Sequence, residues 1–276
     1  MRHIHVASVS STNDLCKALL GTEDAIVVTA DQQTAGRGQR GRRWESPPEG
    51  NLYCSLGFRH HPPITPDQTF AFLFLAALSL KAVAEYFLPH CPLLLKYPND
   101  LYVREQRHWK KLAGILIEHT FAGDRCTATV IGIGVNVEQT TFPTALGEKA
   151  TSFALLGAAV PRSRVLAALL FVFEQLRTQP SQQLFQWWKE ELALEQIALS
   201  LEAGAATVLE ILPDATIRLE QQGKIREHHF HNASLVYDLD AAFQQRLKSA
   251  SLTEKLIARG VLPASGIETL PHTGRQ

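Results

Sequence analysis

The sequence has no excess of charge of either sign, because its 276 residues include 27 lysines and arginines against 27 aspartates and glutamates. This balance argues against a protein that covers nucleic acid through a general positive field, so any basic site must be local. Cysteine is also scarce, and no Cys-x-x-Cys pair occurs among Cys16, Cys54, Cys91 and Cys126. Such widely separated cysteines are typical of reduced, buried thiols rather than of a disulfide framework or a zinc site.

Long hydrophobic runs are missing as well. The longest, residues 70–80, is far shorter than the roughly 20 residues that a membrane span requires. The first residues contain no apolar signal core. We therefore expect a cytoplasmic protein with no membrane partner. Its hydrophobic fraction of 45% is ordinary, which excludes a disordered chain and provides for a sizeable core.

The pattern of apolar residues predicts a group of strands enclosed by helices. Strands are indicated over residues 4–9, 25–30, 51–58, 93–97, 101–104, 111–119 and 127–137. Caps and helical spacing indicate helices after residues 11–14, from 65 to 88, and over 151–156, 163–176 and 181–194. Because strands and helices are grouped rather than strictly alternating, we expect an α+β domain over residues 1–198, with helices packed on a mixed or antiparallel sheet.

Beyond residue 198 the sequence pattern changes from helical spacing to short strands. Short strand patterns at residues 207–212, 216–219 and 224–230 predict a small β module over residues 199–240. A helix over 241–260 and a loose end from 263 are expected in the tail, residues 241–276.

The densest chemical signal is the glycine-arginine loop, residues 33–44, which combines three glycines with four arginines. The glycines let backbone N–H groups approach an anion closely, and Arg37 and Arg42 supply bidentate donors for phosphate or carboxylate. The spacing matches neither a P-loop nor a dinucleotide fingerprint. Composition alone leaves a mobile basic loop, or a segment that contacts RNA, about as well supported as a nucleotide site.

Three further segments carry polar groups at predicted strand ends. Residues 96–100 form a Lys-Tyr-Pro-Asn-Asp turn, and Lys111 stands at the mouth of a strongly apolar strand. In the strand over 127–137, period two places Gly132, Gly134 and Asn136 on one face. That bare face offers a trough for a flat ligand. Each segment taken alone also has a plain structural explanation. The first fits an ordinary β-turn, the second a solvated lysine at a strand edge, and the third a strand that packs closely against a helix.

Taken together and in this order, the segments resemble the biotin protein ligases, which adenylate biotin and transfer it to a lysine of a carrier domain. The matching pieces are residues 11–13, 33–44, 96–100, 111–118 and 132–136, and the resemblance extends over residues 4–195. It implies the class II synthetase-like α+β catalytic domain of the biotin and lipoate ligases. By position, it implies an SH3-like fold for the C-terminal β module.

The resemblance also implies roles for individual residues. The implied catalytic residues are Lys111, Arg37 and Arg42. The implied biotin-binding residues are Ser11, Thr12, Asn13, Gln33, Gly36, Arg37, Gly38, Gln39, Lys111, Gly114, Gly132 and Gly134. The implied ATP-binding residues are Arg37, Arg42, Trp44, Asn99, Lys111 and Asn136, and no residue is assigned directly to a metal.

Two residues depart from the family pattern. Tyr97 stands where the family usually has tryptophan, which keeps an aromatic wall. Gln39 stands where the loop usually has a further arginine, which lowers the positive charge over the intermediate.

The activity implied by the resemblance is ATP- and Mg²⁺-dependent formation of biotinyl-5′-AMP, followed by transfer of biotin to a lysine of a biotin carboxyl carrier protein. Because residue 4 already lies in the catalytic domain, we expect no DNA-binding domain and no DNA partner. Alternatives are a lipoate or octanoyl ligase or transferase, and a non-catalytic RNA-binding or regulatory module. The sequence leaves open the carrier protein, a monomer or a homodimer, and the role of residues 250–276.

Overall fold

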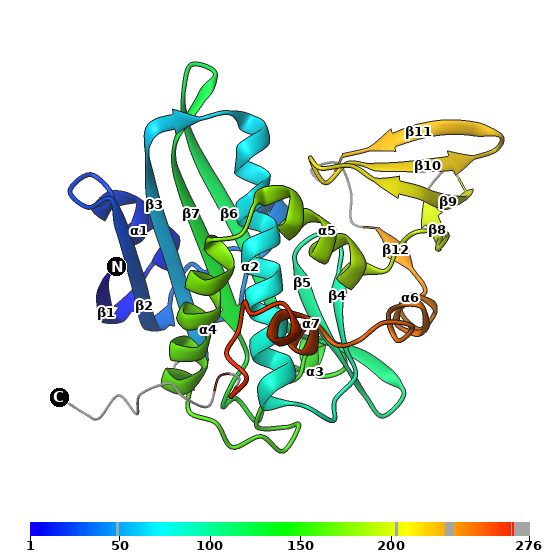
Figure 1. Cartoon of the computed structure of the whole chain (residues 1–276). Coiled ribbons are helices and arrows are strands. Elements are labelled where there is room, and N and C mark those ends of the chain that lie inside the picture. Colours follow the sequence, from blue (N-terminus) through cyan, green and yellow to red (C-terminus); the bar gives the residue numbers. More distant parts are fainter. Residues whose placement is uncertain (48–49, 202–203, 230–234, 266, 268–276) are drawn as a thin grey trace.

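The computed structural model describes residues 1–47, 50–201, 204–229, 235–265 and 267. Its main sheet has seven strands in the order β1-β2-β3-β7-β6-β5-β4 (Figure 1). The strands are β1 (Arg2–Val9), β2 (Ala25–Gln33), β3 (Leu52–Ile64), β4 (Leu93–Lys96), β5 (Asp100–Glu105), β6 (His108–Ala122) and β7 (Arg125–Val135). The β1–β2 pair is parallel and the other pairs are antiparallel. The mixed sheet and the α+β class predicted from the sequence are therefore confirmed.

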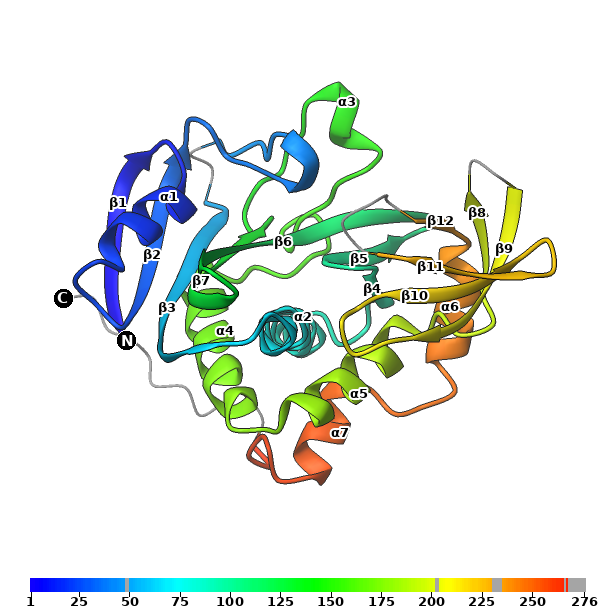
Figure 2. The ribbon, with the colours of Figure 1, turned by 90° about the horizontal axis from the view of Figure 1, so that it is seen from above.

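Helices cover the two faces of this sheet unequally (Figure 2). The helices on the first face are α2 (Pro66–Phe87), α4 (Arg162–Arg177) and α5 (Ser181–Leu192). The other face carries α1 (Thr12–Leu19), the glycine-arginine loop and the short α3 (Thr144–Gly147). The second face is therefore left open enough for a binding site.

The central helix, α2, begins with a capping box between Thr65 and Gln68, with Pro66 at its first position. The helix α2 is long and apolar enough to cross a membrane, but 67% of its apolar stretch is buried inside the protein. It is therefore the core helix, against which α4, α5 and the sheet pack.

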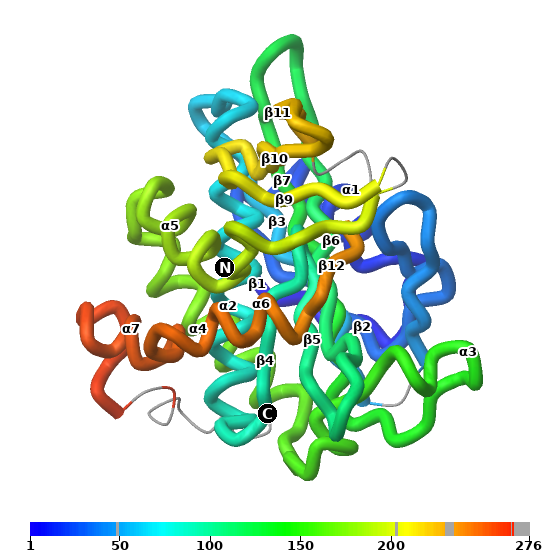
Figure 3. The backbone as a smooth tube through the Cα atoms, turned by 90° about the vertical axis from the view of Figure 1, so that its right-hand side faces the viewer, coloured from blue at the N-terminus to red at the C-terminus, as the bar shows by residue number. Residues whose placement is uncertain are grey.

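A second, five-stranded sheet has the order β11-β10-β9-β8-β12 and lies beyond the β4 edge of the main sheet (Figure 1). Figure 3 shows it from that side, in front of the main sheet. Its strands are β8 (Ala198–Leu201), β9 (Gly204–Ile211), β10 (Ile217–Gln221), β11 (Lys224–His228) and β12 (Val236–Tyr237). The predicted β module is present, and its buried residues belong to the same hydrophobic core as those of the main sheet.

Two predicted helices are wrong. Residues 151–156 form turns, because the N–H groups of Phe153 and Ala154 donate to Asn136 O and Val137 O, outside the segment, instead of to helical partners. The single helix expected over 241–260 is two helices, α6 (Leu239–Arg246) and α7 (Leu252–Ala258). They separate where Ser251 forms a new capping box with Glu254. Most of the end expected to be loose, residue 266 and residues 268–276, lies outside the described residues.

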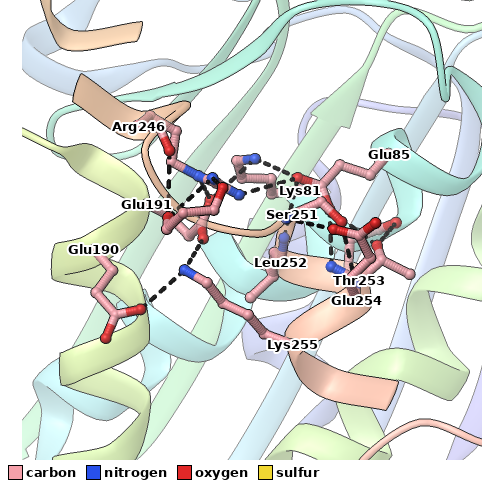
Figure 4. Close-up of polar contacts among 12 residues, drawn as sticks. Lys81, Glu85, Glu190, Glu191, Arg246, Ser251, Leu252, Thr253, Glu254 and Lys255 are labelled. Atoms are coloured by element: carbon pink, nitrogen blue, oxygen red, sulfur yellow. Dashed lines mark hydrogen bonds and ion pairs between the residues drawn. The ribbon is translucent and has the colours of Figure 1, made fainter. Parts of the chain in front are cut away.

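The C-terminal helices are joined to the core by buried charges (Figure 4). Glu191 of α5 is fully buried and contacts Lys81 of α2 (3.1 Å), Arg246 of α6 and Lys255 of α7 (3.2 Å). Glu85 of α2 also contacts Lys81, at 2.5 Å. Because removing one partner leaves an uncompensated buried charge, at a cost of about 3–5 kcal/mol, this cluster fixes α6 and α7 on α2.

A buried histidine predicts a pH dependence of stability. His60 Nε2 lies 2.8 Å from Thr129 Oγ1, and burial, followed by neighbouring His61, lowers the pKa of His60. The folded state therefore disfavours protonated His60, whereas the unfolded chain takes up the proton below pH 6.5 or so. We expect the free energy of unfolding, measured in urea, to fall from pH 7.5 to pH 5.

His60→Gln should flatten this slope, whereas His108→Gln at the exposed first residue of β6 should keep it. Equal slopes in wild type and His60→Gln would contradict the prediction.

Candidate active site

A cavity of about 320 Å³ lies on the open face of the main sheet. All the site residues predicted from the sequence line it, with the exception of Gly36. Gly36 is buried where two parts of the glycine-arginine loop cross, and a Cβ there would lie 2.6 Å from Trp44 O. Its role in this structure is to allow that crossing, and not to line the cavity.

One end of the cavity is a buried polar cluster. Gln33 Oε1 accepts from the N–H (2.9 Å) and the hydroxyl (3.1 Å) of Thr12. Ser55 Oγ donates to Asn13 Oδ1 at 2.6 Å and lies 2.8 Å from Thr12 Oγ1. Sequence reasoning missed Ser55, although period two along β3 places it on the same face as its partners. The cluster presents donors and acceptors together in a site shielded from water.

The loop is held over this end by Arg37. Its guanidinium makes two bonds to Asp14 of α1, at 2.5 and 2.7 Å, and two longer ones to Glu118 of β6, at 3.1 and 3.2 Å. The bond from Arg37 lowers the pKa of Asp14. Glu118 also accepts from Asn13 Nδ2 at 2.7 Å. Arg37 is thus already paired with two carboxylates, and neither of them was among the predicted site residues.

The predicted trough holds the indole of Trp44. A Cβ at Gly134 would lie 2.6 Å from Trp44 Cε2, and one at Gly114 would lie 3.1 Å from Trp44 Cζ3. Lys111 Nζ is 5.1 Å from the centroid of the indole ring. Trp44 Nε1 is buried, and no described residue accepts its proton. The sequence predicted a trough for a flat ligand along Gly132 and Gly134. In the structure, Gly114 and Gly134 admit the protein's own indole, so Trp44 forms a wall of the cavity there.

A β-bulge brings Lys111 to the cavity. Simple alternation would place residues 111 and 114 on opposite faces of β6. The pairing with β5 shifts register between Leu101 and Tyr102, so that Leu112 is skipped. As a result Lys111 Nζ would lie 3.0 Å from a Cβ at Gly114.

The ammonium of Lys111 pairs with Asp100 at 2.7 Å, at the turn that the sequence singled out. Lys96, in the same turn, also lines the cavity. Burial, together with the nearby Lys111 and Arg42, lowers the pKa of Lys96. Several cations and one carboxylate therefore meet at this end, as binding of a polyanion requires.

The two asparagines fix the cavity walls. Asn99 Nδ2 donates to Ile115 O, and Asn136 Nδ2 donates to Thr151 O at 3.0 Å. A further wall follows Asn136, and sequence reasoning missed it because the segment shows no periodic pattern. It consists of Phe142, Leu146, Lys149 and Ala150. Main-chain bonds join this wall to Lys111, whose N–H donates to Lys149 O at 2.8 Å.

Comparisons with known proteins identify the family of the chain. The model of the biotin/lipoate A/B protein ligase family matches residues 6–136. The chain is 34% identical over 215 residues to the biotin--[acetyl-CoA-carboxylase] ligase of Mycobacterium tuberculosis, covering 75% of this chain and 73% of that protein. It is 34% identical to the bifunctional ligase/repressor BirA of Bacillus subtilis, covering 55% of this chain and 46% of that one. It thus spans about half the length of the bifunctional relative.

The fold is also shared with a solved structure. The biotin protein ligase from Aquifex aeolicus in complex with biotin and ATP superposes with a TM-score of 0.66 at 23% identity. The superposition covers 86% of this chain and 98% of that one.

Proposed function

Because the chain belongs to the biotin/lipoate A/B protein ligase family, we propose that it activates biotin with ATP and transfers it to a lysine of a biotin carboxyl carrier protein. The observation that carries the proposal is one cavity with a buried polar cluster at one end and Lys111 at the other. We propose a cytoplasmic location and leave the oligomeric state as monomer or homodimer.

The polar cluster fits the ureido ring of biotin. That ring has one carbonyl and two N–H groups, and each needs a buried partner. The hydroxyl of Thr12 and the amide of Asn13 line the cavity and offer donors and acceptors, and the buried hydroxyl of Ser55 holds both in place. The thioether ring then lies along the glycine face beside Trp44.

The carboxylate of biotin would reach the end that holds Lys111. There it attacks the α-phosphate of ATP, pyrophosphate leaves, and the negative charge of the developing acyl phosphate is neutralised by Lys111. In the second half-reaction the amine of the carrier lysine attacks the acyl carbonyl, and AMP leaves. We propose that Arg42, near Lys96 at this end, and Arg37, once the loop closes over the ligands, hold the phosphate and keep water out.

The donor set near Lys111 fits a magnesium ion that arrives with ATP. Mg²⁺ is usually held by one or two carboxylates together with substrate phosphates. Asp100 is the carboxylate on the cavity at this point, and the described residues contain no group of three or more His, Cys, Asp or Glu that would hold a metal by themselves. When bound, the ion would offset phosphate charge.

The test is pyrophosphate release from ATP on addition of biotin, compared with lipoate and octanoate. We expect release with biotin and not with lipoate or octanoate, because the glycine-arginine loop and the turn at residues 96–100 favour biotin over the alternatives of the same fold. Release with lipoate or octanoate instead would identify the alternative ligase. No release with any of the three acids would favour the non-catalytic module. Transfer to an apo-carrier domain, followed by mass spectrometry, tests the second step.

Ligands should protect the glycine-arginine loop from trypsin. Arg40, Arg42 and Arg43 are exposed, and the glycines lose conformational freedom when the loop closes on a ligand. We expect cleavage at these arginines to slow when biotin and ATP are both present. Cleavage at Arg107, in the exposed turn between β5 and β6, is the internal control and should not change. Equal cleavage of the loop with and without ligands would count against closure.

Gln39→Arg should retain the intermediate longer. Gln39 is half-buried and lines the cavity, whereas Arg40 is exposed and lies outside the lining. Charge-assisted hydrogen bonds contribute roughly 1.5–3 kcal/mol against about 1 kcal/mol for neutral ones. We therefore expect release of biotinyl-5′-AMP to slow about tenfold, at about 1.4 kcal/mol per tenfold.

The matched variant for this measurement is Arg40→Ala, which should release the intermediate at the wild-type rate. Fast release from Arg40→Ala, with no change in Gln39→Arg, would assign the contact to Arg40.

A further inference from the structure

The turn at residues 96–100 is bonded to the C-terminal β module. Tyr97 is 3% exposed, and its hydroxyl donates to Ala215 O, in the turn between β9 and β10, at 2.7 Å. The N–H of Tyr97 donates to the hydroxyl of Tyr237, on β12, at 3.0 Å. One residue of the active-site turn thus makes two buried hydrogen bonds to the module, one to the turn between β9 and β10 and one to β12.

The same turn positions charged groups of the active site. Two residues after Pro98, Asp100 pairs with Lys111 at 2.7 Å, and Asn99 is bonded to Ile115 of β6. All the residues of the turn line the cavity, and Tyr97 also contacts the module. A shift of the turn would move Asp100, and with it the ammonium of Lys111.

Tyr237 is itself held in place by the helix that follows it. The helix α6 begins directly after it, and Asp240 in the first turn of α6 accepts from Trp109 Nε1 of β6 at 3.0 Å. At its other end, Arg246 joins Glu191 in the buried charge cluster of Figure 4. The segment that carries Tyr237 is therefore tied through α6 both to β6 and to α5.

Packing alone does not require the two hydroxyls. The ring of Tyr97 packs near Trp188, with centroids 6.2 Å apart, and a phenylalanine would keep that contact. Burial raises the pKa of both Tyr97 and Tyr237, so each hydroxyl keeps its proton and stays a neutral hydrogen-bonding group. The sequence predicted Tyr97 as an aromatic wall, and the structure adds a partner for its hydroxyl.

We propose that Tyr97 and Tyr237 are positioning residues, through which the C-terminal β module sets the geometry of the Asp100–Lys111 pair for adenylation. This inference rests on the proposed function of the cavity. Neither tyrosine is required to touch the reacting atoms, so loss of either hydroxyl should affect the rate of the chemical step more than the binding of biotin at the far end.

The test uses Tyr97→Phe and Tyr237→Phe in the full chain, with biotin-dependent pyrophosphate release as the activity. We expect kcat to fall about tenfold in each, which corresponds to one lost hydrogen bond, while KM for biotin stays within about twofold of wild type. The double variant should lose less than the product of the two effects, because both act on one turn.

The matched control is Thr253→Val, which removes a 2.9 Å hydrogen bond from Thr253 Oγ1 of α7 to Glu85 of α2. The helix α7 packs on α2, on the face of the main sheet opposite to the glycine-arginine loop (Figure 2). It should lower Tm by an amount similar to the tyrosine variants and leave kcat unchanged. Wild-type kcat in both folded phenylalanine variants, or an equal loss in Thr253→Val, would overturn the inference and leave the proposed function standing. Absence of biotin-dependent pyrophosphate release from the wild-type chain would overturn both.

Discussion

Lys111→Ala is expected to slow formation of biotinyl-5′-AMP at least 100-fold while the protein stays folded. Lys111 Nζ lies at the end of the cavity where, in the proposed reaction, the negative charge of the acyl phosphate develops. The side chain of Lys111 is 28% exposed and that of its partner Asp100 is 20% exposed. Loss of such a charge from the transition state costs roughly 3 kcal/mol or more. The main chain of residue 111 remains bonded to Lys149 and Thr151, so the fold does not depend on the side chain.

The measurement is single-turnover adenylation with enzyme in excess over biotin. Lys110→Ala is the matched control, because Lys110 is the neighbouring residue, pairs with Glu105 at 2.6 Å and does not line the cavity. It should keep its rate within about twofold of wild type. A Lys111→Ala variant with full single-turnover activity would show that Lys111 is a surface lysine without a catalytic role.

Local pattern was sufficient to predict most of the fold. The strands over 93–97, 101–104, 111–119 and 127–137 correspond to β4, β5, β6 and β7, because their apolar runs are bounded by turn residues. The local pattern did not predict strands that form only by pairing with other segments of the chain. Strand β8, of four residues, forms by pairing with β9, and strand β12, of two residues, forms by pairing with β8.

The site was predictable as a set of residues and not as an arrangement. Its members occur in motifs, and the fold brings them to one cavity. Three features depend on contacts between distant segments and leave no trace in local sequence. These are the Asp14–Arg37–Glu118 ion pairs, the indole of Trp44 on the glycine face, and the bonds of Tyr97 to the C-terminal module.

Gly132→Ala is expected to weaken biotin binding by about 10- to 100-fold. A Cβ at position 132 would lie 2.3 Å from Asn13 Oδ1, a distance that real Cβ atoms do not adopt. Asn13 cannot yield easily, because Ser55 Oγ donates to it at 2.6 Å and its own Nδ2 donates to Glu118 at 2.7 Å. Displacing Asn13 breaks one or two buried hydrogen bonds, at about 1–1.5 kcal/mol each or more if a group is left unpaired.

The control separates this effect from the general cost of adding a methyl group. Gly21→Ala adds the same atom at an exposed position, where the nearest contact would be an ordinary 3.6 Å, so its biotin affinity should equal that of wild type. Calorimetric titration with biotin gives Kd for both variants, and thermal unfolding checks that each is folded. The backbone at Gly132 lies outside the left-handed region, so strain does not contribute and the clash with Asn13 is the operative change. A folded Gly132→Ala variant that binds biotin with wild-type affinity would therefore show that Asn13 does not hold the ureido ring, and would move the biotin site away from the polar cluster.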